Sequence, residues 1–287
     1  MLLKKLSPIL ARSYTIPPIR SLSHSYKPII LDHSFPLKNN VGNVRIEVAQ
    51  PCHKSDVVDF TKVHFARREP MMHFWGVDPE TMIDASLGEI IEYSLSTPFS
   101  VLAFLNDDLV GVSLISVYKL GNRKDTSELK IPKDFGTDIH QLRMYYENYE
   151  VAAVLAFLNY FNDIAPSFLP IERGYVGQGH LSVVDSGLEG HGIHTKLVVS
   201  AAQQMASHGI GHYFGVNTSA DSLCAALTLG FEEVYSFPFS EAKIHGKPMF
   251  PGGVMIDGGK KMSILIADNE HVARFYERKK ESRQRRV

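Results

Sequence analysis

Residues 180–194 read as a strand, a glycine-rich turn and a helix, and this stretch constrains the fold most strongly. Leu181, Val183 and Val184 suit an extended strand, and after Gly192 apolar residues recur at helical spacing. Glycines at a helix start let backbone N–H groups approach a ligand, and the helix adds about half a positive charge there. The stretch therefore predicts a phosphate-binding turn.

Three known phosphate-binding turns compete for this pattern. The ATP-binding loop needs a Lys that does not follow Gly192 at the required spacing, and the dinucleotide fingerprint usually follows the first strand of a βαβ unit. The segment Gly187–Gly192 (GLEGHG) instead resembles the pyrophosphate loop of the GNAT acetyltransferases. It departs from that loop at Gly187, where Gln or Arg is usual. The alternative is a glycine-rich turn that opens an ordinary surface helix.

The composition is that of a globular protein with one large domain or two small ones. The 287 residues are 44% hydrophobic and 21% charged, with a formal net charge of −1. This balance gives no whole-molecule nucleic-acid-binding surface, so no nucleic-acid partner is expected. The cysteines, Cys52 and Cys224, form no disulfide framework, and no apolar run reaches membrane-spanning length.

Both ends of the sequence are basic and differ from the body. In residues 1–38, Lys4 and Arg12 lie beside apolar residues, and no acid precedes Asp32. This pattern is typical of a mitochondrial presequence or of a disordered basic leader, so the expected location is the mitochondrial matrix or the cytoplasm. We expect residues 271–287 to form a solvated or disordered basic tail.

Periodicity and turn signals predict the elements between these ends. Strands are expected at 44–50, 100–105, 109–118, 175–184, 212–216, 231–237 and 262–267. Helices are expected at 55–70 and 78–98, as one or two helices at 138–164, and at 193–208 and 219–229.

This order resembles that of the GNAT acetyltransferases, and three segments strengthen the resemblance. Residues 217–231 (NTSADSLCAALTLGF) are similar to the GNAT segment in which a short helix and Leu-Gly-Phe lead into the next strand. Residues 232–241 (EEVYSFPFSE), with the Gly- and Pro-rich connection after them, look like the invertebrate arylalkylamine N-acetyltransferases. Phe65–Pro70 (FARREP) matches the Glu-Pro segment of that family. The resemblance covers roughly residues 44–267.

The resemblance implies an α/β acetyltransferase domain at residues 42–270 with the GNAT fold. That fold is a mixed, mostly antiparallel twisted sheet, flanked by helices on both faces and splayed at the central strands. The implied co-substrate is acetyl-CoA. The implied acceptor is the primary amine of a small arylalkylamine, which attacks the thioester directly.

The pyrophosphate of acetyl-CoA is expected to bind backbone N–H groups of residues 188–193, while strand-edge groups near Leu181 bind the pantetheine amides. An N–H near Val183 would stabilise the oxyanion. Loss of the usual side chain at Gly187 predicts weakened binding of the coenzyme. The predicted cofactor-binding residues are Leu181, Ser182, Val183, Gly187, Leu188, Glu189, Gly190, His191, Gly192 and Ile193.

The resemblance assigns Glu69 as general base. An alkylammonium with a pKa of about 10.4 must lose a proton before it attacks, and an exposed Glu at about 4.3 is a poor base. Burial beside Phe65, Phe74 and Trp75 would raise the pKa of Glu69. The alternative is a helix-terminal carboxylate that pairs with one of the arginines at 67 and 68.

A second proton transfer concerns the group that protonates the leaving thiolate of coenzyme A. The Tyr found in many GNAT enzymes is missing, with Ala226 in that neighbourhood. The arylalkylamine resemblance points to Ser222, with Thr218 or Ser219 near a second position. Capping of the short helix explains the serines equally well. Because the coenzyme thiol has a pKa of about 8.5, the thiolate can also leave without a dedicated acid.

The remaining residues leave three alternatives open. His191 and His194, or His208 and His212, have spacings that a metal could use, but no third ligand is evident and no metal is expected. His180 is interpreted as a packed strand residue. Met71, Met72, Phe74 and Trp75 with residues 240–260 form either an apolar acceptor pocket or plain core.

The sequence therefore predicts a monomeric arylalkylamine N-acetyltransferase. The same fold could serve another amine, an amino acid or a protein N-terminus. Gly187 and Ala226 favour a third alternative, a catalytically degenerate coenzyme A-binding module.

Overall fold

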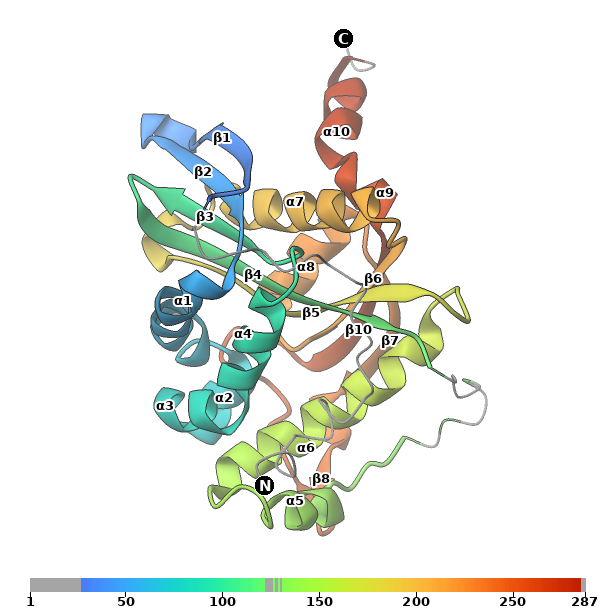
Figure 1. Ribbon diagram of the computed structural model, residues 1–287. Coiled ribbons are helices and arrows are strands. Elements are labelled where there is room, and N and C mark those ends of the chain that lie inside the picture. Colours follow the sequence, from blue (N-terminus) through green and yellow to red (C-terminus); the bar gives the residue numbers. More distant parts are fainter. Residues whose placement is uncertain (1–26, 122–125, 127–128, 130, 285–287) are drawn as a thin grey trace.

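The computed structural model describes residues 27–121, 126, 129 and 131–284 and centres on an eight-stranded sheet of order β1-β2-β3-β4-β5-β6-β10-β7 (Figure 1). The strands of this sheet are β1 (Ile30–Pro36), β2 (Asn43–Val48), β3 (Val101–Leu105), β4 (Asp108–Lys119), β5 (Tyr175–Val184), β6 (His212–Asn217), β7 (Glu232–Pro238) and β10 (Lys261–Asp268). A small hairpin adds β8 (Lys243–Ile244) and β9 (Lys247–Pro248). Within the large sheet only β5 and β6 pair in parallel, and the other neighbours are antiparallel.

Helices cover both faces of the sheet (Figure 1). They are α1 (Lys54–Thr61), α2 (Pro70–Trp75), α3 (Pro79–Met82), α4 (Gly88–Leu95), α5 (Gly136–Leu142), α6 (Tyr149–Ile164), α7 (Ile193–Ser207), α8 (Ala220–Leu229), α9 (Asn269–Ala273) and α10 (Phe275–Gln284). One hydrophobic core lies under α1, α2, α4 and α6, and the other lies under α7 and α9. Strand β3 contributes side chains to both cores, because Leu102 and Phe104 face the first core while Val101 and Ala103 face the second. The predicted mixed, mostly antiparallel sheet with helices on both faces is therefore confirmed.

The central strands β5 and β6 separate along their length. Their parallel register runs from Val176 opposite His212 to Gly179 opposite Gly215 and ends there. Strand β5 stays paired with β4 as far as Val184. A Cβ on Gly179 would lie 2.0 Å from the Tyr213 hydroxyl, so glycine is needed where the strands last touch. Beyond that point β5 offers an edge with no ladder to β6 among the described residues.

Folded structure begins earlier than the predicted boundary of the leader. Residues 30–36, which the sequence places in the basic leader, form β1 and pair antiparallel with β2. The strand has an irregular register and few apolar residues, so its pairing rather than its own pattern defines it. Residues 1–26 lie outside the described residues, and the predicted presequence falls mostly there.

Of the two alternatives predicted for the tail, solvated or disordered, the structure excludes disorder for its described part, because helices α9 and α10 cover most of residues 271–284. Val272 is fully buried, and Phe275 and Tyr276 pack against the second core. Lys196 of α7 lies 5.6 Å from the ring of Phe35 and 5.8 Å from that of Tyr276. These contacts tie both ends of the described chain to α7, and α10 projects beyond the sheet (Figure 1).

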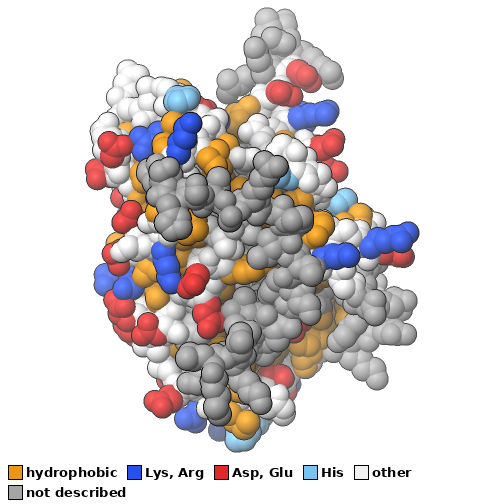
Figure 2. Space-filling view, in the orientation of Figure 1, with side chains coloured by type: hydrophobic (Ala, Val, Ile, Leu, Met, Phe, Trp, Pro, Cys, Tyr) orange, Lys and Arg blue, Asp and Glu red, His pale blue; other side chains and the backbone are white. Residues whose placement is uncertain are grey.

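The distribution of charge agrees with the sequence analysis, whereas one described helical stretch is longer and more apolar than the sequence analysis expected. On the face in Figure 2, acidic and basic side chains of described residues are interspersed, as a net charge of −1 suggests. One helical stretch, Tyr149–Phe168, is long and apolar enough to span a membrane, and 72% of its most apolar window is buried within the protein. A buried core helix passes the same test of length and composition.

Candidate active site

The glycine turn between β5 and α7 begins with two amides that already have acceptors. The N–H of Gly187 donates to Asp185 Oδ1 at 2.7 Å, and the N–H of Leu188 donates to the Asp185 carbonyl at 2.9 Å. The predicted phosphate-binding set started at residue 188, so it loses its first member. Asp185 folds this part of the turn instead.

The second half of the turn has the conformation expected of an anion-binding turn. Gly190 and Gly192 have φ values of +77° and +89°, which L side chains rarely adopt. Gly192 is the N-cap of α7, and no side chain among the described residues caps that helix. The first amides of a helix have no intrahelical acceptor, so those of residues 193–195 point out of the helix end, whereas the Lys196 N–H already donates to the Gly192 carbonyl. His191 brings to the same turn a buried Nδ1 atom that has no hydrogen-bond partner in the described part of the chain.

Glu69 is buried where α2 begins, only 7% exposed. Its Oε2 accepts the Met72 N–H at 2.7 Å, which caps α2, and its Oε1 accepts the Thr218 hydroxyl at 2.6 Å. Burial raises the pKa of Glu69, hydrogen bonds from Thr218 and the backbone oppose this, and the charge of Asp257 adds to the rise. The direction and main cause match the expectation from sequence. The arginine-paired alternative fails for Arg68, which pairs with Glu189.

The Glu69–Thr218 contact joins two segments that the sequence singled out separately. Thr218 directly follows β6, on the side of the splay opposite β5. On the β5 side, Arg68 Nη1 lies 3.5 Å from the Val184 carbonyl. Glu69 and its neighbour therefore bridge the two diverging strands.

Replacement of Thr218 by Val tests the control of the Glu69 pKa. The lost hydroxyl donor stabilises the carboxylate, so its removal raises the pKa of Glu69 further. Since a base works when deprotonated, the acid limb of the kcat/KM profile should move to higher pH. Thr228→Val is the matched control, because the Thr228 hydroxyl donates to the Cys224 carbonyl on α8. An acid limb at the wild-type pH in Thr218→Val would contradict this link.

The two predicted catalytic serines lie at the start of α8. Ser219 is the N-cap, and its Oγ accepts the Ser222 N–H at 3.4 Å, so the capping alternative is present in the structure. Ser222 is partly buried in the first turn. Asp257, which the sequence did not suggest, adds a second cap by accepting the Ala220 N–H at 2.7 Å. An acid role for either serine stays a prediction.

Ser219→Ala measures the capping role. The variant should lower the free energy of unfolding by about 1 kcal/mol, the usual cost of losing a capping hydroxyl. Denaturant unfolding gives this value, with Ser222→Ala as the comparison that keeps the cap. Equal stability of Ser219→Ala and wild type would argue against capping.

His180 is the residue of β5 at the first position past the last pair with β6. Its Nε2 lies 2.7 Å from Ser116 Oγ, and burial lowers the pKa of His180 to about 4. The ring is therefore neutral at pH 7 and packed, as predicted. Leu181 and Val183 are buried toward the first core, and Ser182 lies between them on β5.

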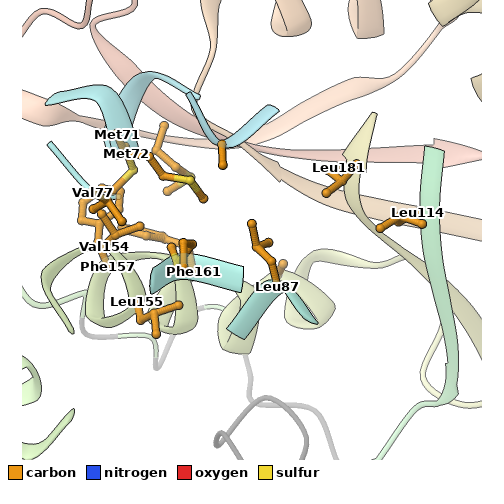
Figure 3. Close-up of a cluster of buried hydrophobic side chains, with 14 of the residues drawn as sticks. Met71, Met72, Val77, Leu87, Leu114, Val154, Leu155, Phe157, Phe161 and Leu181 are labelled. Carbon is orange, nitrogen blue, oxygen red and sulfur yellow. The ribbon is translucent and has the colours of Figure 1, made fainter. Parts of the chain in front are cut away.

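The proposed acceptor pocket is partly core. Met71 and Met72 are buried, and Figure 3 shows them beside Phe157 of α6, with Leu181 and Leu114 on the neighbouring strands. Phe74 and Trp75 are only partly buried and lie 5.4 Å and 6.4 Å, centroid to centroid, from Phe250. The loop 240–260 thus meets α2 through Phe250. Whether the exposed sides of these rings contact an acceptor stays a prediction.

The histidine pairs do not extend to a metal cluster. In the part of the chain that the structure describes, no group of three or more His, Cys, Asp or Glu is arranged to hold a metal ion.

Comparison with solved structures decides the fold. Arylalkylamine N-acetyltransferase 2 from Aedes aegypti matches with a TM-score of 0.58 and 17% identity, covering 79% of this chain and 100% of that one. Putative arylalkylamine N-acetyltransferase 7 from the same mosquito matches with a TM-score of 0.62 and 16% identity, covering 87% and 100%. The chain has the GNAT fold. A Drosophila melanogaster polyamine N-acetyltransferase shares this fold, with a TM-score of 0.55, 13% identity and coverage of 78% and 99%. No protein-family model and no curated protein matches the chain.

The described elements place the predicted site residues around the splay between β5 and β6. The glycine turn and Glu69 lie at the splay, linked through Arg68 to Glu189. Ser219 and Ser222 lie beside Thr218, which touches Glu69. Sequence reasoning missed Lys38, whose Nζ donates to the Gly190 carbonyl of the turn, Arg68 as a partner of Glu189, and Asp257, which caps α8. No local pattern marks them, because each acts across a long separation in sequence.

Proposed function

We propose that this protein is an acetyl-CoA-dependent N-acetyltransferase that acetylates the primary amine of a small arylalkylamine by direct attack. The observation that carries the proposal is the position of Glu69. It is a buried carboxylate with a raised pKa, at the splay of a GNAT sheet and near an uncapped glycine turn. Solved structures with this fold include arylalkylamine N-acetyltransferases.

The residues present fit coenzyme A. Gly190 and Gly192, both with positive φ, present no side chain at these two positions of the turn, and no side chain among the described residues caps α7. The diphosphate would bind the amides of Glu189–Ile193, and the edge of β5 at Leu181, Ser182 and Val183 would pair with the pantetheine amides. The apolar helix α8 buries only Leu229 and exposes Leu227, which leaves apolar surface beside the splay. Acetyl-CoA would supply the activated acetyl thioester.

The chemistry assigned to the protein is mainly removal of one proton. Glu69 accepts it from the alkylammonium, directly or through a water molecule, and its raised pKa makes it a better base than an exposed carboxylate. A backbone N–H near Val183 stabilises the oxyanion that forms when the amine attacks. After attack the nitrogen loses its second proton to solvent as the C–S bond breaks. The sulfur leaves as a thiol with a proton from Ser222, which solvent then reprotonates, or as the thiolate, since the coenzyme thiol has a pKa of about 8.5.

A second candidate keeps the fold and changes the acceptor to another amine, an amino acid or a protein N-terminus. The polyamine N-acetyltransferase neighbour supports it. A third, a coenzyme A-binding module without turnover, is motivated by Gly187 and Ala226.

An amine panel with purified protein and acetyl-CoA separates the three candidates. Thiol release with arylalkylamines alone supports the proposal. Release with polyamines, amino acids or peptides instead moves the assignment to the second candidate. Coenzyme binding without turnover on any acceptor supports the third.

The location and assembly of the protein are part of the proposal. We propose a monomer in the mitochondrial matrix or the cytoplasm. A tagged protein lacking residues 1–31 should lose import if those residues are a presequence, and sedimentation gives the mass in solution.

A further inference from the structure

Two cations from outside the glycine motif lie against the turn. Lys38, between β1 and β2, donates from Nζ to the Gly190 carbonyl at 2.6 Å. Arg68, just before α2, pairs through Nη2 with Glu189 of the turn, and its Nη1 lies 3.5 Å from the Val184 carbonyl. Both therefore reach the two ends of the turn from distant parts of the chain.

The turn itself carries more negative than positive side chains. Asp185 and Glu189 are acidic, and Gly187 has no side chain to offset them. The side chains that face them are the imidazole of His64, whose Nε2 lies 3.9 Å from Asp185 Oδ2, and the guanidinium of Arg68, which pairs with Glu189. These carboxylates repel a bound diphosphate, so positive side chains beside the turn would strengthen the binding that the backbone amides provide.

The geometry points to Arg68 and Lys38 as the side chains that bind the diphosphate of coenzyme A, in place of the side chain missing at Gly187. The inference rests on the proposed function. Arg68 suits this role, because its planar fork bonds a phosphate with two parallel N–H groups, while Lys38 provides a point charge. Glu189 holds Arg68 beside the turn until the more highly charged diphosphate replaces it.

The rival explanation is a structural brace, in which the Arg68–Glu189 pair merely holds the turn in shape. The two explanations differ for Glu189→Gln. A structural brace is broken equally by loss of Arg68 or of Glu189, so Arg68→Gln and Glu189→Gln would both weaken binding of coenzyme A. If Arg68 instead binds the diphosphate, loss of Glu189 frees the Arg68 side chain, so only loss of Arg68 would weaken binding of coenzyme A.

Calorimetric titration of the full-length protein with coenzyme A at low ionic strength tests the inference. Arg68→Gln and Lys38→Gln should each raise the Kd about tenfold, the effect of one charge-assisted hydrogen bond. Arg67→Gln is the matched control, since Arg67 is the exposed neighbour that interacts electrostatically with Asp78. Glu189→Gln should lower the Kd about twofold to fivefold.

A rescue variant completes the test. Gly187→Arg should return the Kd of Arg68→Gln to within about threefold of wild type, because Gly187 has an ordinary φ and open space near it apart from Asp185. Wild type that gives no heat with coenzyme A would overturn the proposed function and this inference with it. If wild type binds coenzyme A, two results would overturn this inference alone. One is that Arg68→Gln binds as tightly as wild type, and the other is that Glu189→Gln binds as weakly as Arg68→Gln.

Discussion

Glu69→Gln should lower kcat by roughly 100-fold or more, the range for loss of a general base. The amide cannot accept the ammonium proton, yet its oxygen can still cap α2 at Met72, so the fold should remain. The measurement is thiol release from acetyl-CoA with a saturating arylalkylamine. Coenzyme affinity, measured by calorimetry, should stay near the wild-type value, because Glu69 is assigned to the amine.

The pH profile sharpens this prediction. In wild type, kcat/KM should rise with pH through the raised pKa of Glu69, because only the carboxylate accepts a proton. That limb should disappear in Glu69→Gln. Glu172→Gln, at an exposed position in the connection before β5, is the control and should keep both turnover and profile. Wild-type turnover in folded Glu69→Gln would remove Glu69 from the mechanism.

Gly190→Asp should raise the Kd for acetyl-CoA by roughly 10- to 100-fold. The residue has a φ of +77° and lies in the turn assigned to the diphosphate. A carboxylate there adds a like charge to the phosphate site, and at an effective dielectric of about 20 one such charge at 4 Å costs about 4 kcal/mol before screening. Calorimetry at two salt concentrations measures the effect, which should shrink at high salt.

Gly209→Asp is the control for backbone strain. Gly209 follows the other end of α7 with a φ of +75°, and nothing lies within 4 Å of a Cβ there, as at Gly190. Both variants therefore carry similar strain and the same charge, but only one lies at the turn. Equal Kd values for the two variants would show that the turn does not bind the diphosphate.

Much of the fold followed from local pattern. The alternation of Leu102 and Phe104 with Val101 and Ala103 marks a strand between two cores, and the helical spacing after Gly192 marks α7. The elements at the two ends were not predicted, because β1 depends on its pairing with β2 and the last helices depend on the packing of Val272. A single sequence shows its periodicity but not its partners.

The candidate site divides in the same way. Glu69 stood out because the segment Phe65–Pro70 resembles a family motif, and the two glycines stood out because a glycine-rich turn before a helix has a local signature. The Glu69–Thr218 bond, separated by 149 positions, could not be read from either segment. The same holds for Lys38 at Gly190, across 152 positions. Such contacts are fixed only when the sheet brings its splayed strands and its edge together.

The most direct measurement is a calorimetric titration of the folded, full-length protein with acetyl-CoA. The account predicts saturable binding of one acetyl-CoA per chain that weakens as salt is raised, because the diphosphate is held by charge and backbone amides. Absence of heat at any concentration that saturates a typical acetyl-CoA enzyme would contradict the account.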